Sequence, residues 1–245
     1  MLALDAEDPR AIAVAAAIRG GEVDRLNQLL EEDPELARAE IVRHSEHGAT
    51  GRSLLHVATD WPGHIANGAE IVRRLVAAGA DVNARFAGPH HETPLHWAAS
   101  SDDVEVLDVL LDAGADIEAP GAVIGGGTPL ADAVAFGQWR AARRLVEHGA
   151  RTTLWQAAAL GLMSRVREAV AGAPAPAAAE ITNAFWCACH GGQREAAEYL
   201  LERDADINWV GHDGLTPLDA ALRSGARELA EWLRARGAAS AREVR

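Results

Sequence analysis

The sequence predicts an all-α fold, a solenoid of about seven helix-turn-helix units joined by short β-hairpin loops. A Thr-Pro-Leu motif recurs at Thr93, Thr128 and Thr216, each time opening a short alanine-rich stretch. Segments rich in Leu, Val and Ala that end in a Gly-Ala-Asp or Asp-Ala-Asp turn occupy residues 70–84, 104–119 and 194–209. Motifs that recur in register indicate units that bury their apolar faces by stacking on one another.

Each part of one unit has a local physical reason. Thr at a helix N-cap accepts a hydrogen bond from a free backbone N–H, and Pro at the first helical position lacks the N–H that would be left unpaired. The second helix carries apolar residues at i, i+3 and i+4, which in the third unit are Val104, Leu107, Leu110 and Leu111. Gly114 then ends that helix, as a glycine after a helix C-terminus commonly does.

TPLHWAA at residues 93–99 and the tails LVAAGADVNA and LLDAGADIEA resemble the ankyrin repeat. The resemblance covers about residues 11–239 and implies a single domain, 1–245. It also implies that His96, in the TPLH position, forms structural hydrogen bonds between units. The expected repeats and a short tail are approximately 11–41, 49–85, 88–120, 125–151, 152–180, 181–210, 211–239 and 240–245.

The spacing departs from a regular repeat at two places. Ser53 and Thr93 are 40 residues apart, and the excess falls in DWPGHIANG, residues 60–68. Thr128 and Thr152 are only 24 residues apart, so the hairpin between the fourth and fifth units is lost. We therefore expect an inserted loop at 60–68 and a continuous but irregular array, with a change of curvature, over residues 150–182.

Composition limits the classes of partner. The formal net charge is −13, which disfavours nucleic acid and favours a partner with a basic surface. The longest apolar run, residues 11–18, is too short to cross a membrane. Cys187 and Cys189 are too close for an ordinary disulfide, which favours a reducing, cytoplasmic location. All 23 basic residues are Arg in an alanine-rich and glycine-rich chain, which suggests a GC-rich, bacterial genome.

The cluster His90, His91, Glu92 and His96 imitates a zinc-protease motif. A zinc site of that class needs two histidines at i and i+4 on one helix face. His91 and His96 are five apart, about 140° off one face, and Pro94 opens a helix between them. We therefore predict no metal and no cofactor.

Three other segments imitate chemical motifs. GAVIGGGT, 121–128, has Gly127 where a phosphate-binding loop needs lysine, and DADINWVGHDG, 204–214, lacks the glycine and acid of a calcium loop. The thiols in CACH, 187–190, fit small buried side chains. With no nucleophile–base pattern in view, we predict that the chain is not an enzyme.

The resemblance to ankyrin repeats implies that hairpin tips and the exposed face of the first helices form a concave binding surface. Among the residues expected there, Trp61, Phe136, Trp209 and Leu215 are large apolar groups suited to anchoring an interface. The inserted loop is the most individual feature of this surface. The predicted partner-binding residues are Arg52, Trp61, His64, His90, Glu92, Ser100, Ser101, Phe136, His190, Trp209, His212, Asp213, Leu215 and Arg223.

These observations predict a monomeric, non-enzymatic scaffold or regulator that binds a protein partner through hairpin tips and the concave helix face. The alternative is a small-ligand or metal-binding accessory component of an enzyme system. That reading would use a histidine-rich rim made of His44, His47, His56, His64, His90 and His91.

Overall fold

The computed structural model describes residues 2–46 and 48–244. The single domain expected from the sequence divides into two compact units, an N-terminal unit that ends at Ala150 and a C-terminal unit that begins at Arg151. The boundary falls at the place where the short spacing between Thr128 and Thr152 removes a hairpin.

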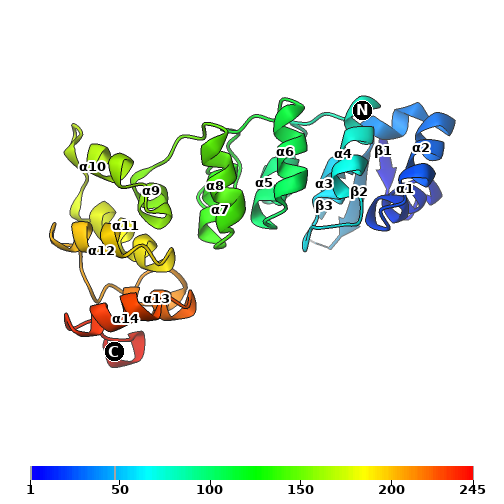
Figure 1. Ribbon diagram of the computed structural model, residues 1–245. Helices are drawn as coiled ribbons and strands as arrows, with labels where there is room; N and C mark the ends of the chain where they lie inside the picture. The colour runs from blue at the N-terminus through cyan, green and yellow to red at the C-terminus, as the bar shows by residue number, and fades with distance from the viewer. Residues whose placement is uncertain (1, 47, 245) are drawn as a thin grey trace. The chain divides into compact units, whose positions relative to one another are not determined.

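The N-terminal unit consists of stacked helix pairs (Figure 1). Helices α1, α3, α5 and α7 pack in one row, and α2, α4, α6 and α8 pack in a second row behind them. The helices of this unit are α1 (Pro9–Arg19), α2 (Val23–Glu32), η1 (Pro34–Arg38), α3 (Leu54–Ala58), α4 (Gly68–Ala77), α5 (Pro94–Ser100), α6 (Val104–Asp112), α7 (Pro129–Ala135) and α8 (Trp139–Glu147).

A three-stranded sheet corrects the all-α expectation. Strand β1 (Ala3–Asp5) pairs in parallel with β2 (Glu40–Ser45), and β2 pairs in antiparallel register with β3 (Gly48–Ser53). The side chains of Leu4 in β1 and Ile41 in β2 are buried, and their burial stabilises the pairing of β1 with β2. A strand as short as β1 has no alternating pattern that could be recognised from sequence.

The predicted helix starts are confirmed. Thr93, Thr128 and Thr216 are N-caps followed by Pro, and Ser53 caps α3. At the fifth unit the cap is Thr153 rather than Thr152, and Gln156 takes the position of the TPLH histidine. Since Gln156 accepts from the backbone N–H of Thr153 at 2.8 Å, it closes the same capping box that histidine closes in other units.

His96 has the structural role implied by the resemblance. Its Nδ1 accepts from the backbone N–H of Thr93 at 3.0 Å, and its Nε2 lies 3.4 Å from the carbonyl oxygen of Gly127 in the next unit. His56 repeats the arrangement one unit earlier, with Nε2 3.1 Å from the carbonyl oxygen of Glu92. Burial lowers the pKa of each imidazole to about 4, so both rings are neutral at pH 7.

The C-terminal unit continues the pairing of helices. Its elements are α9 (Leu154–Leu160), α10 (Met163–Ala171), α11 (Ala178–His190), α12 (Arg194–Leu201), η2 (His212–Gly214), α13 (Pro217–Arg223), α14 (Arg227–Arg234) and α15 (Ala241–Val244). Helix α11 begins at Ala178, three residues before the expected start of its repeat at 181, and Glu180 caps it by accepting from the backbone N–H of Ala177 at 2.8 Å.

Small side chains let the helices of the C-terminal unit approach closely. Ala157 and Ala158 on α9 are buried against α11, and a Cβ atom at Gly191 would overlap the Ala159 carbonyl. Cys187 and Cys189 are buried in this core and form no disulfide. Burial raises the pKa of the Cys187 thiol to about 12 and raises that of Cys189 as well. Both thiols are therefore protonated at neutral pH and pack as small, unreactive side chains.

Candidate functional site

The inserted loop at 60–67 separates α3 from α4, as the repeat spacing predicts. It is tied to the helix pairs on both sides. The Asn67 side chain donates to the carbonyl oxygen of Gly21 at 2.9 Å. The backbone N–H of His64 donates to Asp103 Oδ2 at 2.8 Å, and His64 Nε2 lies 3.0 Å from the carbonyl oxygen of Ser101. His64 therefore fastens the loop to the third pair.

The fixed loop presents Trp61 to solvent, with 80% of its surface exposed. Trp61 lines a hollow of about 410 Å³ together with side chains from the next two units. Phe136, at the end of α7, is 49% exposed on the same hollow, and Trp97 on α5 is half-buried there. We call this the aromatic hollow, and its lining residues are Asp60, Trp61, Glu92, Trp97, Ser100, Val123, Phe136 and Gln138.

The aromatic hollow brings together four of the residues predicted to bind a partner, namely Trp61, Glu92, Ser100 and Phe136. Arg52 lies next to them, because its Nη1 forms an ion pair with Asp60 Oδ2 at 2.6 Å. Arg52 also lines a smaller hollow of about 150 Å³ whose other lining residues include Trp97.

Trp97 and Val123 are functional candidates that the sequence analysis missed. Trp97 could have been found, because it stands three residues before Ser100 on the same short helix and shares its face. Val123 could not, because its place depends on the path of the loop between α6 and α7.

Three of the residues predicted to bind a partner are buried instead of exposed. Glu92 precedes the N-cap of α5, and its carbonyl oxygen accepts from His56 and from the backbone of Phe86. Ser101 is the C-cap residue of α5, and its carbonyl oxygen lies 3.0 Å from His64 Nε2. His190 ends α11, where its carbonyl oxygen accepts from the Ser224 hydroxyl at 2.5 Å. His90 is exposed, as expected for a hairpin tip.

Two buried carboxyl groups, Glu92 and Asp132, have raised pKa values beside the aromatic hollow. Burial raises the pKa of Glu92, against the opposing effects of a hydrogen bond to the Trp97 side chain and the charge of His90. Asp132 on α7 has no exposed surface, and burial, followed by repulsion from Glu92, raises its pKa to about 7. Asp132 Oδ1 accepts from the backbone N–H of Ile124 at 3.4 Å, whereas Oδ2 finds no hydrogen-bond donor within the described residues.

The remaining predicted residues gather in the C-terminal unit. The ring of His212 lies 5.1 Å from Trp186 and 5.7 Å from Trp209, and its Nε2 lies 2.9 Å from Asn183 Oδ1. Trp186 is buried, and its indole donates to the carbonyl oxygen of Leu215 at 2.9 Å. Trp209 and Leu215 are half-buried rather than exposed. Close by, Arg223 forms an ion pair with Asp213 at 2.5 Å.

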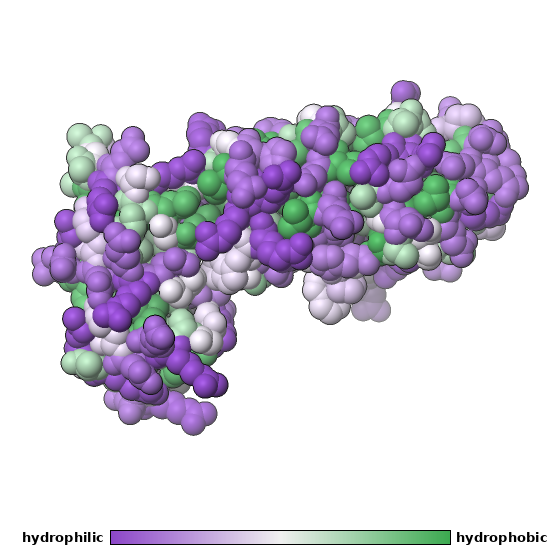
Figure 2. Space-filling model, in the orientation of Figure 1, coloured by the Kyte–Doolittle hydropathy of each residue, from purple (hydrophilic) through white to green (hydrophobic). Residues whose placement is uncertain are grey.

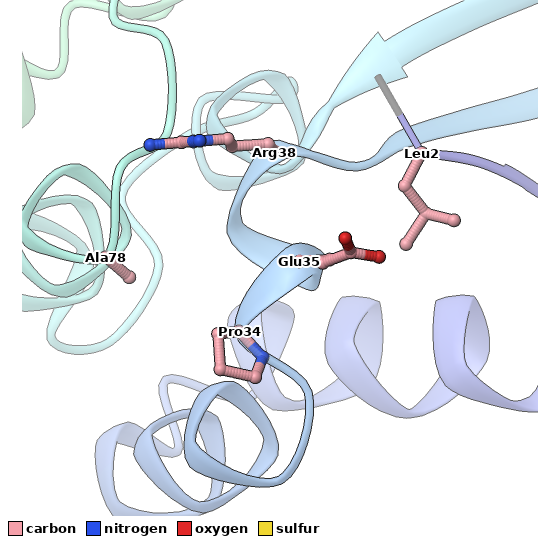
Figure 3. A pocket seen from close by; sticks show the side chains of 5 residues that line it. All are labelled: Leu2, Pro34, Glu35, Arg38 and Ala78. Carbon is pink, nitrogen blue, oxygen red and sulfur yellow. The ribbon is translucent and has the colours of Figure 1, made fainter.

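A third hollow, of about 600 Å³, lies beside η1 and contains none of the predicted residues (Figure 3). Its lining side chains are those of Leu2, Pro34, Glu35, Arg38 and Ala78. The Arg38 guanidinium extends across it and donates from Nε to the carbonyl oxygen of Gly79 at 3.1 Å. Without aromatic groups, this hollow offers a partner weaker anchors than the aromatic hollow does.

The histidines of the predicted rim do not converge on one site. His56 is buried, His64 fastens the inserted loop, and exposed His44 lies 3.9 Å from the Asp5 carboxylate. His47 lies outside the described residues. No group of three or more potential metal ligands occurs within residues 2–46 and 48–244.

Two surface properties bear on the kind of partner. The face shown in Figure 2 is covered mainly by hydrophilic residues, with hydrophobic ones in small separate patches. Within the described part of the chain, no helix combines the length and apolar character needed to cross a membrane.

Comparison with known proteins identifies the repeat. The model of the family described as "Ankyrin repeats (3 copies)" matches residues 64–154 and again 154–242. The chain is 30% identical over 169 residues to the ankyrin repeat and KH domain-containing protein mask-1 of Caenorhabditis elegans. It is 44% identical over 64 residues to the E3 ubiquitin-protein ligase KEG of Arabidopsis thaliana.

These relatives are much longer proteins. The matches cover 67% and 26% of this chain but only 5% and 4% of mask-1 and KEG, so this chain spans a small part of the length of either relative. The helix pairs, the Thr-Pro caps, the bridging histidines and the match of the family model agree. This chain therefore belongs to the ankyrin repeat family.

Proposed function

We propose that the chain is a non-enzymatic scaffold or regulator that binds a protein partner through the aromatic hollow of the N-terminal unit. The observation that carries this proposal is the meeting of Trp61, Trp97 and Phe136, from three consecutive helix pairs, around one hollow. Aromatic side chains at the centre of a concave surface are the usual anchors of protein interfaces. Trp61 is 80% exposed and Phe136 is 49% exposed, so the stacking of the repeats leaves apolar surface open to a partner at both positions.

The family supports this function in general terms, because ankyrin repeats are generally protein–protein interaction modules. The fold does not name the partner, since unrelated targets bind to the same repeat architecture. The formal charge of −13 favours a partner with a basic surface.

We also propose that the helix pairs from α1–α2 to α13–α14 are seven repeats, that the chain acts as a monomer, and that it works in the cytoplasm. Seven consecutive pairs within the described residues support the repeat count. The two buried free thiols support a reducing compartment.

Removing both exposed anchors should abolish most of the binding. We expect Trp61→Ala combined with Phe136→Ala to raise the Kd of the partner by about tenfold or more, because anchor residues dominate interface energies. The partner would be captured from a lysate of the source organism, identified, and titrated against each purified variant by calorimetry.

The matched control is Ile12→Ala, which removes an apolar side chain that is 51% exposed on α1 and outside the aromatic hollow. It should bind the partner as the unchanged protein does. Equal affinity of the double variant and the unchanged protein would remove the aromatic hollow as the binding site.

A further inference from the structure

We propose that the aromatic hollow binds a cationic side chain, an arginine or a lysine, that the protein partner presents. This inference rests on the proposed function, because it assigns the chemistry of the group that the same hollow would accept.

Aromatic rings are the first feature of the hollow that favours a cation. Trp61 and Phe136 are exposed on the hollow and Trp97 is half-buried in it, so three aromatic rings border one space of about 410 Å³. The faces of aromatic rings attract a guanidinium or ammonium group, and tryptophan does so most strongly. The same rings accommodate the aliphatic stem of either side chain.

A buried carboxylate in the lining is the second feature that favours a cation. Glu92 lines the hollow with only 8% of its surface exposed, and no arginine forms an ion pair with it within the described residues. Asp60, the other acid of the lining, already forms an ion pair with Arg52. Glu92 is therefore the carboxylate that a cation entering the hollow would meet.

Asp132 adds a second buried carboxyl group that a cation in the hollow would stabilise. It is fully buried on the helix that ends at Phe136, its Oδ2 has no hydrogen-bond donor among the described residues, and it interacts electrostatically with Glu92. Two buried carboxyl groups near each other are unfavourable when both are ionised, and a nearby cation relieves that repulsion. A purely apolar anchor would leave this repulsion uncompensated.

The test uses small probes that carry only the proposed group. Nα-acetyl-arginine amide and Nα-acetyl-lysine amide would be titrated into the full-length protein, with the neutral citrulline and norleucine amides as matched controls. Two-dimensional ¹H–¹⁵N NMR reports on each indole N–H separately, so binding is read at Trp61 and Trp97. We expect saturable shifts of these two signals with the cationic amides and about tenfold weaker binding of the neutral ones.

Glu92→Gln should weaken the binding of the arginine amide by about tenfold, because it removes the charge and keeps the shape. Glu31→Gln, an equal change of charge on the exposed surface of α2, should leave the affinity unchanged within about twofold. If Glu92→Gln fails to fold, Trp61→Ala serves instead, since that side chain is 80% exposed, and it should also weaken binding.

Equal binding of arginine and citrulline amides, equal effects of Glu92→Gln and Glu31→Gln, or no shift at Trp61 and Trp97 would each overturn the inference. Those results would leave the proposed function standing if the Trp61→Ala, Phe136→Ala variant still loses its protein partner. Retention of the partner by that double variant would overturn both.

Discussion

Replacing Leu107 with alanine is expected to lower the free energy of unfolding of the N-terminal unit by roughly 2–5 kcal/mol. Leu107 has no exposed surface and lies on α6, which packs between α4 and α8 in the second row of helices. The change removes a large buried side chain and leaves a cavity that neighbouring repeats fill only in part. Urea denaturation followed by circular dichroism measures the loss.

His91→Ala is the paired control from a hairpin tip. Its side chain is exposed, and the contact that the structure shows for His91 is a hydrogen bond from Arg85 to its backbone carbonyl oxygen, which alanine retains. The free energy of unfolding should change by less than about 0.5 kcal/mol. A cost as large as that of Leu107→Ala would show that the tip assignment is wrong.

Replacing Asp132 with asparagine is expected to stabilise the protein at pH 8, by roughly 1–4 kcal/mol. Asp132 is fully buried, and its pKa rises from 3.8 to about 7 because burial and then Glu92 disfavour the charged form. At pH 8 the folded protein therefore holds an ionised carboxylate in an unfavourable place. Asparagine keeps the size, removes the charge, and retains an oxygen that accepts from Ile124.

The sign of the pH dependence follows from proton binding. Between about pH 4 and pH 7 the folded protein keeps a proton on Asp132 that the unfolded chain has released, so stability falls as pH rises through this range. The advantage of Asp132→Asn should therefore grow from pH 4 to pH 7 and then level off. His56 and His96 have the opposite effect, since their lowered pKa of about 4 makes stability fall as pH falls below about 6.5.

The difference in stability between the Asp132→Asn variant and the unchanged protein reports on Asp132 alone. His56 and His96 are present in both proteins, so their contribution to the pH dependence cancels. Urea denaturation of both proteins at pH 4.5, 6 and 8 provides the measurement. Asp112→Asn, at an exposed position on α6, should change stability by less than about 0.5 kcal/mol at all three pH values. An Asp132→Asn effect that stays constant with pH would contradict burial of an ionisable carboxyl group at this position.

Much of the fold follows from sequence because its signals are local. Thr93 caps its helix through residues three positions away, and the apolar spacing around Leu107 repeats within one helix. The insertion at 60–68 and the missing hairpin before Thr153 appeared as changes in repeat spacing alone. The one-residue error at Thr152 arose because two adjacent threonines satisfy the same capping rule, and only the contact with Gln156 selects Thr153.

The binding surface was predictable only in part. Trp61 and Phe136 were recognised as large apolar groups at positions that stacking leaves exposed, and both lie on the aromatic hollow. Trp209 and Leu215 met the same criterion, yet both are half-buried around His212 and Trp186. Register within a repeat predicts the direction of a side chain but does not predict which neighbouring unit covers it.

The sequence by itself determined the ankyrin repeat, its helix caps, its small-residue core and the place of its insertion, because these depend on residues within a few positions of one another. The tertiary structure decided the β1–β2–β3 sheet, the burial of Glu92 and Asp132, and the meeting of Trp61, Trp97 and Phe136. Those features join residues that are tens of positions apart in the chain. Their contacts and their pKa values depend on how neighbouring repeats stack, which no local pattern records.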